Sequence, residues 1–150
     1  AVPCGIIYMY VRAKVPRKGS VLLMCTLVAL IAFCLGITWP SALGLFIGGI
    51  FAEIISAVGK YTNKLWNLIG YIVFICSFWL GQALYMILGT EMFMNSMVRQ
   101  GTDLEFAQSL VDFVSGPMFI VCLLATIVLA AIGGFLGYTL FKKHFSKLEA

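Results

Sequence analysis

Long uncharged stretches alternate with short polar segments along the whole chain. Residues 21–39, 65–90 and 117–141 contain no charged residue, and residues 41–59 contain only one. An α-helix needs about 20 apolar residues to cross the roughly 30 Å hydrocarbon core of a membrane. Each of these four stretches is therefore predicted to span the membrane. Residues 1–11 are also uncharged but too short to cross alone, so they are predicted to form part of a further span.

The basic residues mark one side of the membrane. All of them except Arg99 fall within three clusters, at residues 12–18, 60–64 and 142–147. Because consecutive spans alternate in direction, all three clusters reach the same side, and cytoplasmic loops are enriched in Lys and Arg. The sequence therefore predicts a cytoplasmic location for these clusters and for the basic tail at 142–150. The connection at 91–116, which carries most of the acidic residues, is predicted to lie outside.

The overall composition supports a membrane protein with a single transmembrane domain over residues 1–150. Hydrophobic residues make up 62% of the chain and charged residues 11%, and the mean hydropathy is +1.04. The net charge of +4 would suggest nucleic acid as a partner of a soluble protein. In this chain the positive-inside rule already explains the positive charge. The lipid bilayer is therefore the expected partner, and no nucleic acid is expected.

The connection at 91–116 contains a helical pattern of its own. Thr102 and Glu105 have the spacing of a capping box, and apolar residues then recur at helical intervals between Leu104 and Val114. We therefore predict a short amphipathic helix. It could cover a site on the outer face, or it could be an ordinary interfacial linker, and the sequence leaves both open.

Glu53 is the one ionisable residue inside a predicted span. A charge at the centre of a spanning helix costs on the order of 3 kcal/mol, so Glu53 needs a partner, a protonated state or a function. It lies near the predicted cytoplasmic end of its helix, within reach of two lysines. The structural interpretation is a protonated carboxyl or one directed toward Lys60 or Lys64, and the alternative is a functional role.

Small residues recur at intervals of four in two of the predicted spans. Such stripes let helix backbones approach closely, either within one chain or against a separate membrane subunit. The residues concerned are Gly44, Gly48 and Ala52 in one span and Ala130, Gly133, Gly134 and Gly137 in the last.

Aromatic and amide side chains collect near the predicted outer ends of the spans. A mostly apolar pocket with a few polar groups is the usual form of a small-molecule site, although Trp and Tyr also favour membrane interfaces without any ligand. The candidate substrate-binding residues are Trp39, Trp79, Gln82, Tyr85 and Arg99.

No combination of residues in the sequence indicates catalysis. The chain lacks the phosphate-binding, zinc-protease and serine-hydrolase motifs, and its single histidine, His144, lies in the basic tail. The five cysteines include no closely spaced pair, so we expect free thiols and no metal site. We therefore predict that the protein is not an enzyme and uses no cofactor.

Two stretches resemble a known family. They are residues 48–53, continuing through 59–61 and 66–67, and the basic ending at 142–147. Together they resemble the Trep_Strep family, also called the MptD family, of substrate-binding S components of energy-coupling-factor (ECF) transporters. The resemblance extends along nearly the whole chain.

This resemblance implies a six-helix fold in a prokaryotic plasma membrane, of which the chain would supply about helices two to six, with the first helix missing. It further implies a micronutrient bound at the outer face beneath the connection at 91–116. The implied partners are a membrane coupling subunit and two ATP-binding subunits that power uptake. The alternative is a structural or assembly protein that packs against other subunits through its small-residue stripes and binds no solute.

Overall fold

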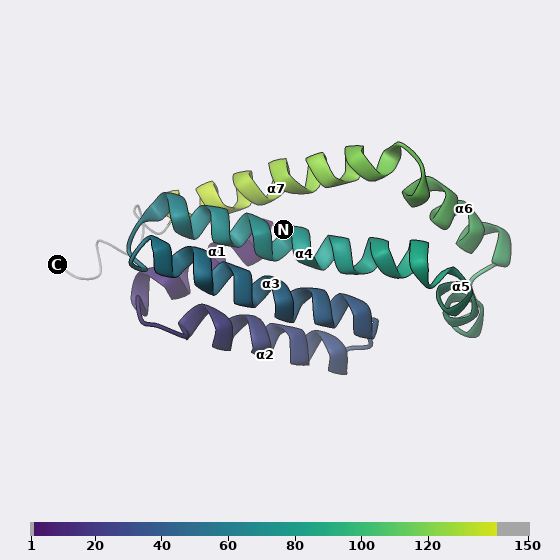
Figure 1. Ribbon diagram of the computed structural model, residues 1–150, viewed down its shortest axis with the longest axis horizontal. Coiled ribbons are helices and arrows are strands. Elements are labelled where there is room, and N and C mark those ends of the chain that lie inside the picture. The colour runs from purple at the N-terminus through teal and green to yellow at the C-terminus, as the bar shows by residue number, and fades with distance from the viewer. Residues whose placement is uncertain (1, 141–150) are drawn as a thin grey trace.

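In the computed structural model, which describes residues 2–140, all regular secondary structure is helical (Figure 1). This confirms the predicted all-α membrane bundle. The basic tail at 142–150 lies outside the described residues. The helices are α1 (Val2–Lys14), α2 (Ser20–Cys34), α3 (Trp39–Val58), α4 (Lys64–Leu88), α5 (Thr90–Arg99), α6 (Leu104–Ser115) and α7 (Met118–Leu140).

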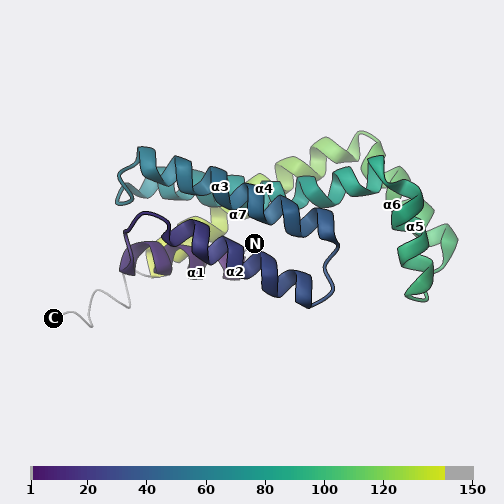
Figure 2. The ribbon, with the colours of Figure 1, turned by 60° about the horizontal axis from the view of Figure 1, so that its bottom comes forward.

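The long helices lie side by side, and their connections gather at two ends (Figure 1). The turns at 15–19 and 59–63 lie at one end, which we call the basic end because Arg17, Lys18 and Lys60 are there. Helices α5 and α6 lie at the opposite, acidic end, where Figure 2 shows them at a steep angle to the long helices.

Three helices, α3, α4 and α7, are long and apolar enough to cross a membrane, whereas α2 is apolar but has only 15 residues. The predicted span at 21–39 is thus helical only to Cys34. It ends early because Gly36 adopts a left-handed conformation with φ of 90°. The N–H groups of Gly36 and Ile37 donate to the carbonyl oxygens of Phe33 and Ala32, which closes the helix end with a glycine-based Schellman motif.

Glycines bring the backbones of two helix pairs into contact. A Cβ atom on Gly137 of α7 would lie 2.7 Å from the carbonyl oxygen of Gly5 in α1, and one on Gly44 of α3 would lie 2.5 Å from the carbonyl oxygen of Ser77 in α4. No side chain fits in either space. Around these contacts α1, α2, α3, α4 and α7 share a core that includes Tyr8 and Tyr71, whose ring centroids are 5.2 Å apart.

A second, smaller core joins the part of α4 nearest the acidic end to α5 and α6. Tyr85, Met86, Phe93 and Val111 are buried in it. The connection at 91–116 therefore contains two helices where one was predicted. The predicted capping box also does not form, because Asp103, not Thr102, is the residue before α6 and its side chain makes no capping hydrogen bond.

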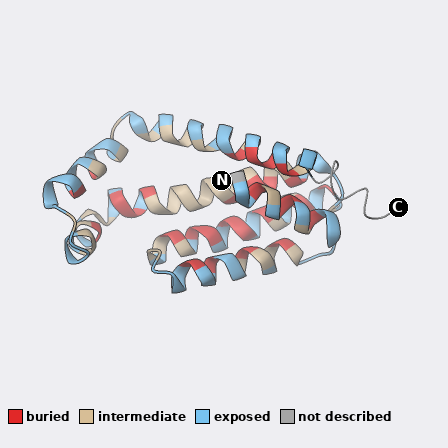
Figure 3. Ribbon diagram, turned by 180° about the vertical axis from the view of Figure 1, so that it is seen from behind, coloured by how far each residue is buried: buried red, intermediate tan, exposed pale blue. Residues whose placement is uncertain are grey.

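Burial follows the pattern of a membrane bundle. Buried residues face the interior, while large apolar side chains cover the outward surfaces, most extensively on α7 (Figure 3). Only 17% of the most apolar stretch of α7 is buried within the chain. Lipid is the solvent that can cover this exposed apolar surface without a free-energy penalty.

Candidate substrate groove and polar clasp

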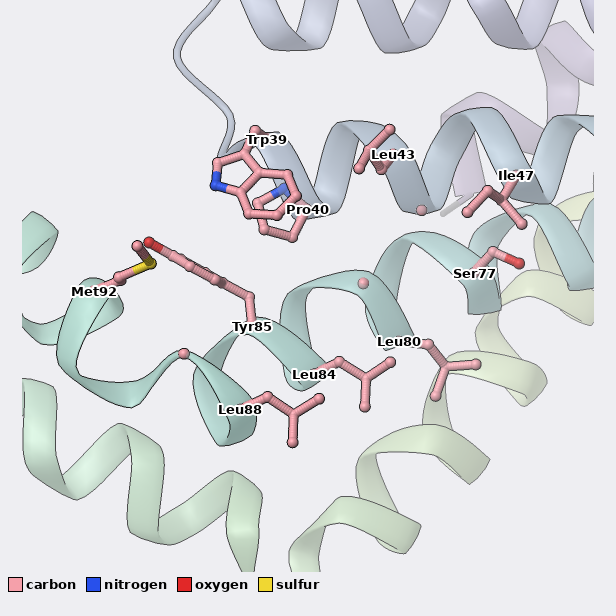
Figure 4. A pocket seen from close by; sticks show the side chains of 13 residues that line it. Trp39, Pro40, Leu43, Ile47, Ser77, Leu80, Leu84, Tyr85, Leu88 and Met92 are labelled. Atoms are coloured by element: carbon pink, nitrogen blue, oxygen red, sulfur yellow. The ribbon is translucent and has the colours of Figure 1, made fainter.

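A groove of about 460 Å³ lies between α3 and α4 toward the acidic end (Figure 4). Its volume falls within the range of small-molecule sites, roughly 300–1,000 Å³. Most of its wall is aliphatic or aromatic, and Ser77 supplies one hydroxyl. The lining residues are Trp39, Pro40, Leu43, Gly44, Ile47, Ser77, Leu80, Gly81, Leu84, Tyr85, Leu88, Gly89 and Met92.

The bottom of the groove is the close crossing of α3 and α4. A Cβ atom on Gly81 would lie 2.7 Å from the carbonyl oxygen of Pro40 and 3.3 Å from the Cα atom of Gly44. Because neither glycine carries a side chain, the two backbones form the floor while Leu43, Ile47 and the leucines of α4 form the sides. The groove is therefore built on a rigid backbone contact.

Two aromatic side chains lie on opposite sides of the groove, toward the acidic end of the bundle (Figure 4). The Trp39 indole, from the first turn of α3, is 57% exposed, whereas Tyr85, from α4, is only 9% exposed. The ring of Phe93 in α5 meets the Tyr85 ring edge to face, with centroids 6.0 Å apart. This contact and its burial restrain Tyr85, whereas most of the Trp39 side chain is exposed.

Gln82 does not line the groove but ties the start of α3 to α4. Its Oε1 accepts hydrogen bonds from the hydroxyls of Thr38, at 3.0 Å, and Ser41. The two hydroxyl oxygens also lie 2.8 Å apart, so two hydroxyl protons are shared among the three oxygens of this cluster. The structure therefore places Gln82 where it positions the residues on both sides of Trp39, and not where it would contact a ligand in the groove.

The remaining two candidate ligand residues lie elsewhere. Trp79 packs against Phe119 of α7, with ring centroids 4.9 Å apart, and Arg99 is exposed at the end of α5. Of the five candidates, the structure thus brings only Trp39 and Tyr85 together. The apolar residues that complete the groove, such as Leu84 and Met92, carried no signal that would distinguish them from ordinary lipid-facing positions.

Glu53 is directed toward the start of α2 and not toward Lys60 or Lys64. One carboxylate oxygen accepts a hydrogen bond from the backbone N–H of Gly19 at 2.6 Å, and the other accepts from the N–H groups of Val21 and Leu22 at 3.2 Å each. The first N–H groups of a helix have no partner within it, and the helix dipole favours a negative charge there. Glu53 therefore caps α2 from a different helix.

Arg12 joins three other segments at the same end of the bundle and is only 3% exposed. Its guanidinium donates to Ser20 Oγ at 2.6 Å, to the Tyr61 carbonyl oxygen at 2.9 Å and to Asn67 Oδ1 at 3.3 Å. It also lies 5.0 Å from the centroid of the Tyr61 ring. We call Arg12, Glu53, Tyr61 and Asn67 the polar clasp. Sequence analysis counted Arg12 only as one charge in a basic cluster.

The turn between α3 and α4 adopts an unusual backbone conformation to complete the clasp. Lys60 and Tyr61 both have positive φ, at 50° and 62°, although neither is glycine. The N–H groups of these residues donate to the carbonyl oxygens of Ala57 and Ser56, which directs the Tyr61 carbonyl toward Arg12. Burial and the negative charge of the nearby Glu53 carboxylate raise the pKa of Tyr61 above its usual value.

The small-residue stripes lie in contacts within the chain. Gly44, Gly48 and Ala52 face α4, and Gly133, Gly134 and Gly137 face α1 and α4. Ala130 is fully buried in the core. Within the described residues, no group of three or more His, Cys, Asp or Glu side chains is placed to hold a metal ion.

Comparison with known families identifies the chain. A family model described as "Hypothetical bacterial integral membrane protein (Trep_Strep)" matches residues 1–147. The chain belongs to the Trep_Strep family. No curated protein and no solved structure matches it. As a Trep_Strep member it is an integral membrane protein of bacteria, and α3, α4 and α7 supply its candidate spans.

Proposed function

We propose that this Trep_Strep protein is the substrate-binding S component of an ECF-type importer. The groove between α3 and α4 is the observation that carries the proposal, because it combines the volume of a small-molecule site with aromatic side chains from both helices. Its position near α5 and α6 also agrees with capture of a micronutrient at the outer face. A membrane coupling subunit and two ATP-binding subunits would supply the energy for uptake.

The alternative is an assembly protein that binds no solute and packs against other subunits through its small-residue stripes. In the structure these stripes are occupied by α1 and α4 of the same chain, as the 2.7 Å approach at Gly137 illustrates. They are therefore not available for a second subunit unless α1 or α4 moves away. This observation favours the S component.

The proposal is tested by purifying the full-length protein from its native bacterial membrane in mild detergent and identifying by mass spectrometry what copurifies. We expect a membrane coupling subunit together with two ATP-binding proteins. As a matched control, an unrelated polytopic protein of the same membrane carries the same tag. Recovery of a lone protein or a homo-oligomer would contradict the assignment.

The orientation that the proposal requires is tested separately. In a variant without native cysteines, single cysteines replace Gln100 at the acidic end and Thr62 at the basic end, both of which are exposed. A membrane-impermeant thiol reagent applied to intact cells is expected to label position 100 and not position 62. The opposite pattern would place the groove on the cytoplasmic side and exclude capture from outside.

A further inference from the structure

We propose that the groove between α3 and α4 selects uncharged, flat aromatic molecules and excludes anionic ones. This inference deepens the S-component proposal and rests on it for its biological meaning, but it concerns what the groove itself can bind. It follows from three features of the groove: the charge of its lining, the placement of its rings, and the nature of its remaining walls.

The lining carries no formal charge. None of its thirteen residues is Asp, Glu, Lys, Arg or His, and the polar side-chain groups are the indole N–H of Trp39 and the hydroxyls of Ser77 and Tyr85. A carboxylate or phosphate moved from water into such a site would lose hydration without gaining a partner of opposite charge.

The rings give the groove a preference for flat molecules. Trp39 and Tyr85 lie on opposite sides of it, and Phe93 holds the tyrosine in place. Aromatic pairs contribute about 0.5–1.5 kcal/mol beyond the burial of their area, so an aromatic ligand gains more here than an aliphatic ligand of the same size. The sulfur of Met92, which also lines the groove, adds a polarisable contact for a ring.

An acyl chain of a lipid is the competing occupant, because the walls between the rings are leucine and isoleucine. The aromatic rings favour an aromatic ligand over an acyl chain, since a chain has no ring face to stack on them. The hydroxyl groups also favour it, because an amide or heteroaromatic group can form hydrogen bonds with them and a hydrocarbon chain cannot.

The test uses three probes of similar size: 2-naphthamide, which is neutral and aromatic, 2-naphthoate, which is its anionic counterpart, and decanamide, which is neutral and aliphatic. Binding to the full-length protein in nanodiscs is measured by equilibrium dialysis, with empty nanodiscs to subtract partition into lipid. We expect 2-naphthamide to bind at least about tenfold more tightly than either of the other two, a difference of about 1.4 kcal/mol.

Two matched pairs of variants locate the binding. Leu84→Trp fills the groove and is expected to weaken 2-naphthamide binding at least about tenfold, whereas Leu136→Trp, on the exposed face of α7, is expected to leave it unchanged. Trp39→Leu is expected to remove the preference for naphthamide over decanamide. Trp66→Leu, at the basic end, should retain that preference. Thermal unfolding of each variant controls for loss of the fold.

The proposal is overturned by equal or tighter binding of 2-naphthoate, by equal binding of decanamide, by an unchanged affinity in the folded Leu84→Trp variant, or by no binding of 2-naphthamide up to about 1 mM. Its failure is distinguishable from failure of the transporter assignment. Copurification of ATP-binding subunits together with a preference for 2-naphthoate would refute the substrate class alone. The expected probe preference without such subunits would refute the transporter alone.

Discussion

Replacement of Glu53 by Gln tests whether one carboxylate fixes the start of α2. Three backbone N–H groups, of Gly19, Val21 and Leu22, donate to its two oxygens. The substitution keeps the size of the side chain but removes its charge. It also replaces one accepting oxygen with an NH₂ group, which cannot accept a hydrogen bond from a backbone N–H.

The expected loss follows from these contacts. Hydrogen bonds to a charged group contribute about 1.5–3 kcal/mol each, and the interaction of a carboxylate with a helix N-terminus about 0.3–2 kcal/mol. Glutamine retains one neutral acceptor, and Glu53 is only partly buried, so the full sum is not lost. We expect Glu53→Gln to reduce the free energy of unfolding by about 2–3 kcal/mol, which lowers the melting temperature by about 5–10 °C in a chain of this size.

Thermal unfolding in detergent, followed by thiol-reactive dye fluorescence, measures this change. Glu91→Gln is the matched control, because Glu91 is exposed in the first turn of α5 and no other helix depends on it. Hydrogen exchange adds a local readout, since the N–H groups of residues 19–22 should exchange faster in the Glu53 variant only. If the two variants unfold at the same temperature with the same exchange at these residues, Glu53 does not cap α2.

Three further predictions use the same unfolding assay. Gly137→Ala should destabilise the protein by about 1–3 kcal/mol, because its Cβ meets the α1 backbone at 2.7 Å, while Gly116→Ala, with its nearest contact at 3.5 Å, should change little. Arg12→Met should lower stability by about 2–4 kcal/mol through the loss of three hydrogen bonds, and Arg17→Met, on the surface, by less than about 0.5 kcal/mol. Lys60→Gly should raise stability by about 0.5–1 kcal/mol, because glycine adopts the observed positive φ without strain, and a decrease would contradict this account.

Hydrophobic patterning predicts most of the helices because the lipid solvent demands long apolar segments. There are two exceptions: α5, which was not predicted, and α2, where the apolar run continues to Trp39 but the helix ends at Cys34. The signal was present in Gly36, which favours the left-handed conformation of a helix C-terminus. Composition alone gave no reason to prefer this glycine over Gly44 or Gly48, which lie inside α3 and serve as packing contacts.

The candidate ligand residues on α4 were grouped by sequence proximity, and helix geometry separates them. Trp79, Gln82 and Tyr85 are three residues apart, and each step of three falls about 60° short of a full turn. Over the two steps the side chains therefore rotate around the helix. Trp79 meets α7, Gln82 meets the start of α3, and Tyr85 reaches the groove and α5.

The partner of Glu53 could not be predicted from the sequence because it consists of backbone atoms. Among side chains, the oppositely charged residues within reach along the sequence are Lys60 and Lys64. In the structure the Lys64 ammonium lies 4.5 Å from the centroid of the Tyr138 ring, and the carboxylate binds N–H groups that every non-proline residue has. Only the packing of α2 against α3 determines which N–H groups these are.

Contacts at both ends of α3 limit how far this helix can move and so how the shape of the groove can change. Glu53 fixes α2 to α3 at the basic end, and the contact of Gly44 with Gly81 fixes α3 to α4 near the groove floor. A close-packed contact of backbone atoms resists sliding, so α3 cannot tilt away from α4 without losing the Gly44–Gly81 contact, and Glu53 makes α2 move together with α3. Access to the groove must therefore depend on its other walls, which are the partly exposed Trp39 after the turn at 35–38 and Met92 at the start of α5. In the binding that we propose, a ligand would enter past these two residues and lie against the close backbone contact of α3 and α4.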